Sequence, residues 1–240
     1  MSPERSSLAR AAGVLAGGVA LAGVGYAAYA AAVWLQYGRD GADGRSGNAA
    51  DLLDRFMPAY EVEERHATVV DAPASATFEA ARAMDINRAP LVRAIFTVRT
   101  LPSRVRGHVR PAVSRSLVDE TQKLGWRVLG EIPGKALVMG AYTQPWRSEP
   151  TFRGLSPDEF TAFNEPGYAK IVWTLEVEWL GPARSRFVTR TRVATTDRYA
   201  RKRFRRYWAV MSPGIVLIRR ASLGLVKRDA EHRWKGRGSA

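Results

Sequence analysis

The chain of 240 residues contains no cysteine and only three histidines. The absence of thiols excludes disulfide bonds, thiolate metal sites and a cysteine nucleophile. The histidines, His66, His108 and His232, are far apart in the sequence and form no metal-binding motif. No recognisable catalytic motif is present either, so the sequence assigns no catalytic residue, no metal ligand and no cofactor.

Acidic residues are scarce relative to basic ones. There are 23 Asp and Glu against 37 Lys and Arg, a net charge of +14. Residues 197–240 carry 13 Lys and Arg against three acids. Such a surface favours a polyanionic neighbour, which could be anionic lipid, nucleic acid or an acidic protein, although a solvated helix face also explains it. Nucleic acid is the least favoured partner, because no nucleic-acid-binding motif accompanies the charge.

Residues 11–35 contain no charged side chain. A helix of this length spans about 37 Å, which exceeds the hydrocarbon core of a bilayer. The segment therefore predicts a membrane anchor. The alternative is a cleaved signal peptide, in which Arg5 and Arg10 form the charged end and the small residues at 28–30 or 30–32 form the cleavage site.

These features predict three parts. Residues 1–36 form the anchor or signal segment, residues 37–50 form a glycine-rich flexible linker, and residues 51–240 form one folded domain. The charges that flank the anchor favour a single-pass protein with its domain outside the cytoplasm. The basic C-terminal region argues for the opposite side, because the cytoplasmic leaflet is the anionic one.

The domain begins with short elements and ends with long ones. A strand is predicted at 60–70, where Glu64 and His66 share one face by two-residue alternation. Turn-forming residues and periodicity then predict helices at 74–84 and 116–124, a hairpin of strands 126–132 and 135–142, and a helix from Ser156, with a helix or strand at 91–98.

Residues 168–180 and 186–196 are predicted to pair as a long hairpin. One face carries Ile171, Trp173, Leu175, Val177 and Trp179 from the first strand and Phe187, Thr189, Thr191 and Val193 from the second. The other face places Glu176 and Glu178 near Arg186, Arg190 and Arg192. We expect these opposite charges to pair on an exposed surface and to fix the register.

A long helix is predicted from Asp197, its N-cap, towards Glu231. Pro213-Gly214 is expected to kink or break this helix. Its predicted buried stripe consists of Ala200, Phe204, Trp208, Met211, Ile215 and Ile218. The arginines, Arg219 and Arg220 among them, are assigned to the solvent side.

The order of these elements resembles the START-like helix-grip superfamily, which includes the polyketide cyclase/dehydrase and lipid-transport group often labelled SRPBCC. The resemblance rests on Val69-Val70-Asp71-Ala72-Pro73 before the first helix, on the Thr189-Arg190-Thr191-Arg192-Val193 strand and on the helix start at Asp197. Segments at 166–170, 203–208 and 217–220 are similar to those of an uncharacterised bacterial subgroup. The resemblance implies an α+β fold whose antiparallel sheet wraps around the C-terminal helix and encloses a cavity for apolar molecules. The superfamily shares no catalytic residues, so none is carried over.

The expected ligand site lies between the long hairpin and the final helix. A solid core is the alternative, but buried threonine hydroxyls need partners and favour a cavity. The candidate ligand-binding residues are Tyr142, Trp173, Leu175, Phe187, Thr189, Thr191, Phe204, Trp208 and Met211.

Three functions are compatible with these features. The first is a membrane-tethered module that binds or transfers an apolar or lipidic molecule. The second is a cyclase- or hydrolase-type enzyme in which Glu64, His66 or a tyrosine of the cavity is the active group. The third is an interaction domain whose basic C-terminal helix contacts an anionic membrane.

Overall fold

The computed structural model of this chain describes residues 25–32, 34, 37, 48–85, 88 and 116–237. The element expected at 91–98 lies outside these residues, and so does most of the proposed anchor at 11–35. Residues 25–32 and 34 are helical.

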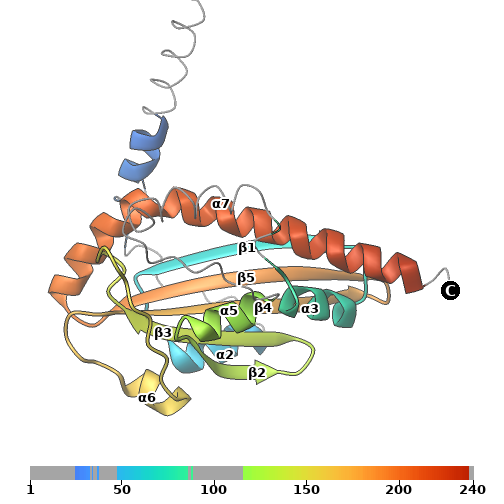
Figure 1. Ribbon diagram of the computed structural model, residues 1–240, viewed down its shortest axis with the longest axis horizontal. Coiled ribbons are helices and arrows are strands. Elements are labelled where there is room, and N and C mark those ends of the chain that lie inside the picture. The colour runs from blue at the N-terminus through green and yellow to red at the C-terminus, as the bar shows by residue number, and fades with distance from the viewer. Residues whose placement is uncertain are drawn as a thin grey trace, which may run out of the picture.

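The centre of the domain is one five-stranded antiparallel sheet (Figure 1). The strands stand in the order β1-β5-β4-β3-β2. They comprise β1 (Val62–Val70), β2 (Arg127–Ile132), β3 (Ala136–Thr143), β4 (Ala169–Gly181) and β5 (Arg184–Thr195). Gly134 has φ of +71° in the turn between β2 and β3, a conformation that glycine adopts without a steric penalty. All five strands agree with those predicted from sequence.

Helices cover both faces of the sheet (Figure 1). They comprise α2 (Asn48–Phe56), α3 (Ala74–Arg82), α5 (Leu117–Lys123), α6 (Pro157–Ala162) and α7 (Arg198–Arg237). Leu53 and Phe56 of α2 and Phe160 of α6 pack on Val138 and Val172 on one face. The opposite face packs against α7 and α3. The predicted α+β fold, an antiparallel sheet with a long C-terminal helix, is confirmed.

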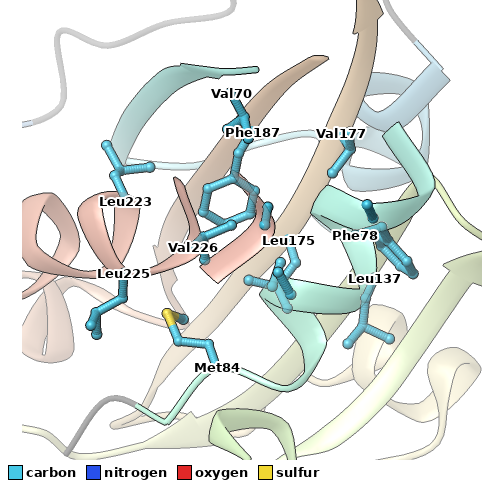
Figure 2. Close-up of a cluster of buried hydrophobic side chains, with 14 of the residues drawn as sticks. Val70, Phe78, Met84, Leu137, Leu175, Val177, Phe187, Leu223, Leu225 and Val226 are labelled. Carbon is cyan, nitrogen blue, oxygen red and sulfur yellow. The ribbon is translucent and has the colours of Figure 1, made fainter. Parts of the chain in front are cut away.

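The helix α7 packs on the sheet through two separate apolar clusters. The first joins Leu223 and Val226 of α7 to Val70 of β1 and Phe187 of β5, and includes much of α3. Figure 2 shows Val226 beside Phe187 in this cluster. The second joins Phe204 and Trp208, near the start of α7, to Val62, Ala169 and Val193. The helix is therefore held at both ends.

The long helix begins where expected and continues through Pro213. The backbone N–H of Ala200 donates to the carboxylate of Asp197 at 2.6 Å, which confirms the N-cap. Of the two expected outcomes, a kink or a break, the structure excludes the break, because α7 is one helix of 40 residues. It changes direction in its N-terminal half (Figure 1), as proline within a helix commonly causes.

The charged face of the long hairpin forms the expected pairs but is not fully exposed. Arg186 pairs with Glu178 at 2.7 Å, and both are partly buried. Arg190 pairs with Glu176 at 3.4 Å, and their side chains are only 10% and 3% exposed. Burial raises the pKa of the Glu176 carboxyl, while hydrogen bonding from Thr174 and the charge of Arg190 oppose this shift. The expectation of a solvent-exposed charge ladder is therefore wrong for this pair.

One helix on that face was not predicted. The helix α2 begins at Asn48, before the expected domain boundary at 51. Arg192 of β5 holds α2 against the sheet. The Arg192 guanidinium pairs with Asp54 and donates to the carbonyl of Met57 at 3.1 Å. The same guanidinium lies 4.3 Å from the ring centroid of Tyr60. The apolar spacing of Leu52, Leu53, Phe56 and Met57 was the sequence signal for this helix.

The chain that leaves the proposed anchor is bound to α7. Arg205 donates to the backbone carbonyl of Trp34 through Nη2 at 2.7 Å, and its guanidinium lies 4.1 Å from the Trp34 ring centroid. Tyr37, which was expected to begin the flexible linker, is buried against Phe204. Its hydroxyl donates to Glu61 at 3.1 Å, and burial raises its pKa. The helix that includes residues 25–32 therefore contacts the first half of α7 (Figure 1).

Among the described helices, α7 alone is long and apolar enough to meet the length and composition expected of a membrane span. One third of its most apolar stretch is buried in the domain. The exposed part includes Val210, Met211 and Leu217, which are 51%, 40% and 44% exposed. Tyr26 of the N-terminal helix donates to the carbonyl of Val210, so this apolar surface adjoins the point where the two helices meet.

Candidate functional site

The middle of the sheet face beneath α7 is polar, between the two apolar clusters. Strand register aligns Glu64 of β1, Thr191 of β5, Trp173 of β4 and Met139 of β3 in one row across the sheet. Since facing residues in antiparallel strands share a side, all four side chains lie on the α7 face.

The adjacent row has the same polarity. His66 of β1 faces Thr189 of β5, and Leu137 of β3 faces Leu175 of β4. Both rows therefore change from polar side chains on β1 and β5 to apolar side chains on β4 and β3. The interface offers an amphipathic surface rather than a uniform core.

Arg219 of α7 completes the polar part. Its Nη2 donates to the Thr191 hydroxyl, and its Nη1 lies 3.5 Å from the Thr189 hydroxyl oxygen. Its Nε is buried and has no hydrogen-bond partner among the residues that the structure describes. No described carboxylate lies within 4.0 Å of the guanidinium.

Burial lowers the pKa of Arg219 to about 10, and the charge of Glu64 partly opposes that shift. The guanidinium therefore remains protonated at neutral pH. An enclosed cation bound only by neutral hydroxyls is costly, because hydroxyl dipoles replace water incompletely. The site therefore places at the centre of the interface a positive charge that Glu64 compensates only partly and that no described carboxylate contacts directly.

Glu64 and His66 are the remaining polar members. Their Oε2 and Nε2 atoms are 3.4 Å apart, and their side chains are 25% and 14% exposed. They do not point away into solvent, because they share the α7 face with Thr189 and Thr191. A carboxylate next to an imidazole can transfer protons to or from a bound molecule.

Aromatic side chains border the apolar part. The ring centroid of Trp173 lies 6.4 Å from that of Trp126, which stacks on Phe152 at 5.2 Å. Trp173 is partly exposed, while Leu175 and Met139 are buried. An aromatic wall of this kind contacts flat or flexible apolar groups equally well.

Most of the predicted binding residues lie on the expected face. Trp173, Leu175, Thr189 and Thr191 surround the polar-to-apolar surface. Three others lie in the flanking clusters: Phe187 in the first, and Phe204 and Trp208 in the second. Their role in ligand binding remains a prediction.

Two predicted residues are elsewhere. Tyr142 faces Lys170 on the opposite side of the sheet, where it stacks on Phe163 at a centroid distance of 4.1 Å. Every residue of β3 is buried, so alternation gave no indication of which face Tyr142 occupies. Met211 is 40% exposed, and the adjacent Ser212 is fully buried in its place.

The apolar periodicity of α7 did not indicate that Arg219 faces the sheet. The buried side of α7 runs through Phe204, Trp208, Ser212 and Val226, and Arg219 lies at the same helical spacing. A search for apolar residues passes over Ser212 and Arg219, and it selects Met211, which is exposed, next to Ser212. Spacing from Trp208 in steps of four and three was the available signal for Arg219.

Metal binding finds no support in the described part of the chain, where no group of three His, Asp or Glu side chains is arranged to hold an ion. The polar groups of the site comprise one cation, two hydroxyls, one carboxylate and one imidazole. These groups can bind a polar head group or move a proton.

Comparison with known proteins shows distant structural similarity. No protein-family model and no curated protein matches the sequence. The chain is similar to the ZhuI aromatase/cyclase from Streptomyces sp. R1128, with 15% identity over 72% of this chain and 94% of that one and a TM-score of 0.27.

Two further structures are similar at the same level. The di-domain aromatase/cyclase BexL from the BE-7585A biosynthetic pathway shares 16% identity over 71% of this chain and 46% of its own, with a TM-score of 0.31. A hypothetical protein of Helicobacter pylori shares 11% identity over 74% of this chain and 93% of its own, with a TM-score of 0.32. These values do not establish a family or an activity for this chain.

Arg190 and Arg219 should respond differently to replacement by methionine. Arg190→Met leaves the buried Glu176 without its partner and should lower the free energy of unfolding by about 3 kcal/mol. Arg219→Met removes an enclosed charge that has no carboxylate partner, and should leave the unfolding free energy unchanged or raise it. Urea denaturation followed by circular dichroism measures both. A loss of about 2 kcal/mol or more in Arg219→Met would show that this arginine has a structural role.

Proposed function

We propose that this chain binds a small molecule with a largely apolar body between its sheet and α7. The observation that carries the proposal is the change in the sheet–helix interface, which is apolar at both ends and polar in the middle. An interface that served only packing would gain stability from apolar residues at positions 189, 191 and 219. Binding sites characteristically combine apolar walls with a few fixed polar groups.

The dye N-phenyl-1-naphthylamine, which is neutral and apolar, tests this proposal. The full chain should bind it with increased dye fluorescence, and Thr189→Trp should weaken binding at least about tenfold by filling the surface next to His66 and Arg219. Thr151→Trp, at an exposed position, is the matched control. Thermal unfolding checks that each variant is folded, and Thr191→Leu replaces Thr189→Trp if the latter is not. Equal dye binding in the wild type and in folded variants of both kinds would contradict the proposal.

Catalysis by the same site is the second candidate function. The observation that favours it is the 3.4 Å approach of Glu64 and His66 on the face that also carries Thr189 and Thr191. In this case His66 or Glu64 exchanges a proton with a bound apolar substrate.

Hydrolysis of p-nitrophenyl butyrate separates the two functions. An enzyme should lose its turnover in His66→Ala by about a hundredfold, while its affinity for the neutral dye stays unchanged. His232→Ala, which alters an exposed histidine, is the control. A binding module hydrolyses the ester no faster than His66→Ala does.

We further propose that residues 11–35 hold the domain at a membrane and that α7 contacts the membrane surface. The support is that Trp34 and Tyr37 are bound to the first half of α7, next to the exposed Val210, Met211 and Leu217. Exposed arginines in the same half, Arg203 and Arg206, suit an anionic surface.

The absence of cysteine makes this contact measurable with a single label. Met211→Cys, labelled with a nitrobenzoxadiazole fluorophore in the full chain, should become brighter in phosphatidylcholine vesicles that contain about one third phosphatidylglycerol. Leu180→Cys, in the hairpin between β4 and β5, should not respond. Equal signals from the two positions would contradict contact through α7. Retention of the chain in membranes at alkaline pH tests the anchor itself.

A further inference from the structure

The hydrogen bonding of Arg219 is incomplete. A guanidinium has five N–H donors, and the structure directs two of the nitrogens to the hydroxyls of Thr189 and Thr191. The buried Nε has no partner. The Nε and the adjacent Nη form one side of the guanidinium fork, which matches the two oxygens of a carboxylate or phosphate.

The buried Nε atoms of Arg190 and Arg192 also have no hydrogen-bond partner among the described residues, but both of these side chains lie near a carboxylate. Arg190 pairs with Glu176 at 3.4 Å, and Arg192 lies 3.6 Å from Glu63 and also pairs with Asp54. Both of these arginines on the opposite face therefore have a carboxylate within 4.0 Å. Arg219 has none within 4.0 Å among the described residues, which identifies an anion as the missing component.

The surroundings indicate what this anion is attached to. From Thr191 the row across the sheet continues to Trp173 and then to Met139, two strands away. Two interstrand spacings correspond to about 10 Å, the length of a bicyclic ring system or a short alkyl chain. A molecule that places its anionic group at Arg219 would extend over Trp173 with an apolar body of this size.

We infer that Arg219 binds the anionic head group of an amphipathic ligand, a carboxylate or a phosphate, whose apolar body lies over Trp173. This inference rests on the proposed binding function and specifies its ligand class. The hydroxyls of Thr189 and Thr191 accept from Arg219 and orient its fork, and their own protons remain available to the head group.

Glu64 is the neighbouring group that opposes this binding. Its carboxylate acts electrostatically on Arg219 and lies 3.4 Å from His66. Like charges repel, so Glu64 should weaken the affinity for any anion at Arg219. Glu64→Gln should therefore tighten binding of an anionic ligand several-fold and leave binding of a neutral one unchanged.

Two dyes with one scaffold test the inference on the full chain. 8-Anilinonaphthalene-1-sulfonate carries an anionic group, and N-phenyl-1-naphthylamine is its neutral counterpart. The wild type should bind the sulfonate at least about tenfold more tightly than the neutral dye. Arg219→Met should abolish that preference, because methionine replaces the apolar part of the arginine side chain and carries no charge. Arg220→Met, at the next and exposed position of α7, should retain it.

The outcomes separate the inference from the function on which it rests. If the neutral dye binds and the sulfonate binds no better, or if Arg219→Met and Arg220→Met lose the preference equally, the assignment of Arg219 is wrong and the binding function stands. If neither dye binds in a manner sensitive to Thr189→Trp, both are wrong.

Displacement of the sulfonate dye identifies the head group. Dodecanoate and dodecyl phosphate should each displace it at concentrations at least about tenfold below that of dodecanol, and the better competitor defines the natural class. Dodecanol that competes as well as both anions would overturn the inference.

Discussion

Packing of α7 across the sheet is the interaction on which the rest of this structure depends. The helix is attached by Phe204 and Trp208 at one end and by Leu223 and Val226 at the other. Buried aliphatic and aromatic side chains of this size stabilise a fold by roughly 1.5–3 kcal/mol each. Two such clusters can hold the helix while the segment between them contributes little to stability, so its residues are available for other roles.

That division explains why polar groups occur in the middle of the interface. A charged side chain in a single continuous core would disrupt packing on all sides. Here Arg219 lies between two clusters that are each complete, and the partly exposed Glu64 and His66 lie at the β1 side of the same surface. The opposite face of the sheet differs, because Glu176 neutralises Arg190 and the carboxylates of Glu63 and Asp54 neutralise Arg192.

Two-residue alternation and turn residues predicted the strands. They also predicted which side chains of β4 and β5 face α7, because each of these two strands has one apolar side. They could not assign Tyr142, since β3 is buried on both faces. The stripe of α7 was predicted correctly at Phe204, Trp208, Ile215 and Ile218, which pack against the two clusters, but not at Met211. Ser212 and Arg219 also face the sheet, and a search for apolar periodicity passes over them. The departure from the pattern therefore coincides with the proposed binding site, and the residue most informative about function was the one assigned to solvent.

A single helix connects this site with the N-terminal segment. Arg205 binds the carbonyl of Trp34, and Arg219 lies 14 residues further along, about 21 Å at the rise of an α-helix. Between them Met211 and Leu217 face outward, away from the sheet. If α7 lies on a membrane, its outer side contacts lipid and its inner side carries the ligand surface. An amphiphile at the outer side of α7 would then have to pass around only one helix to reach Arg219.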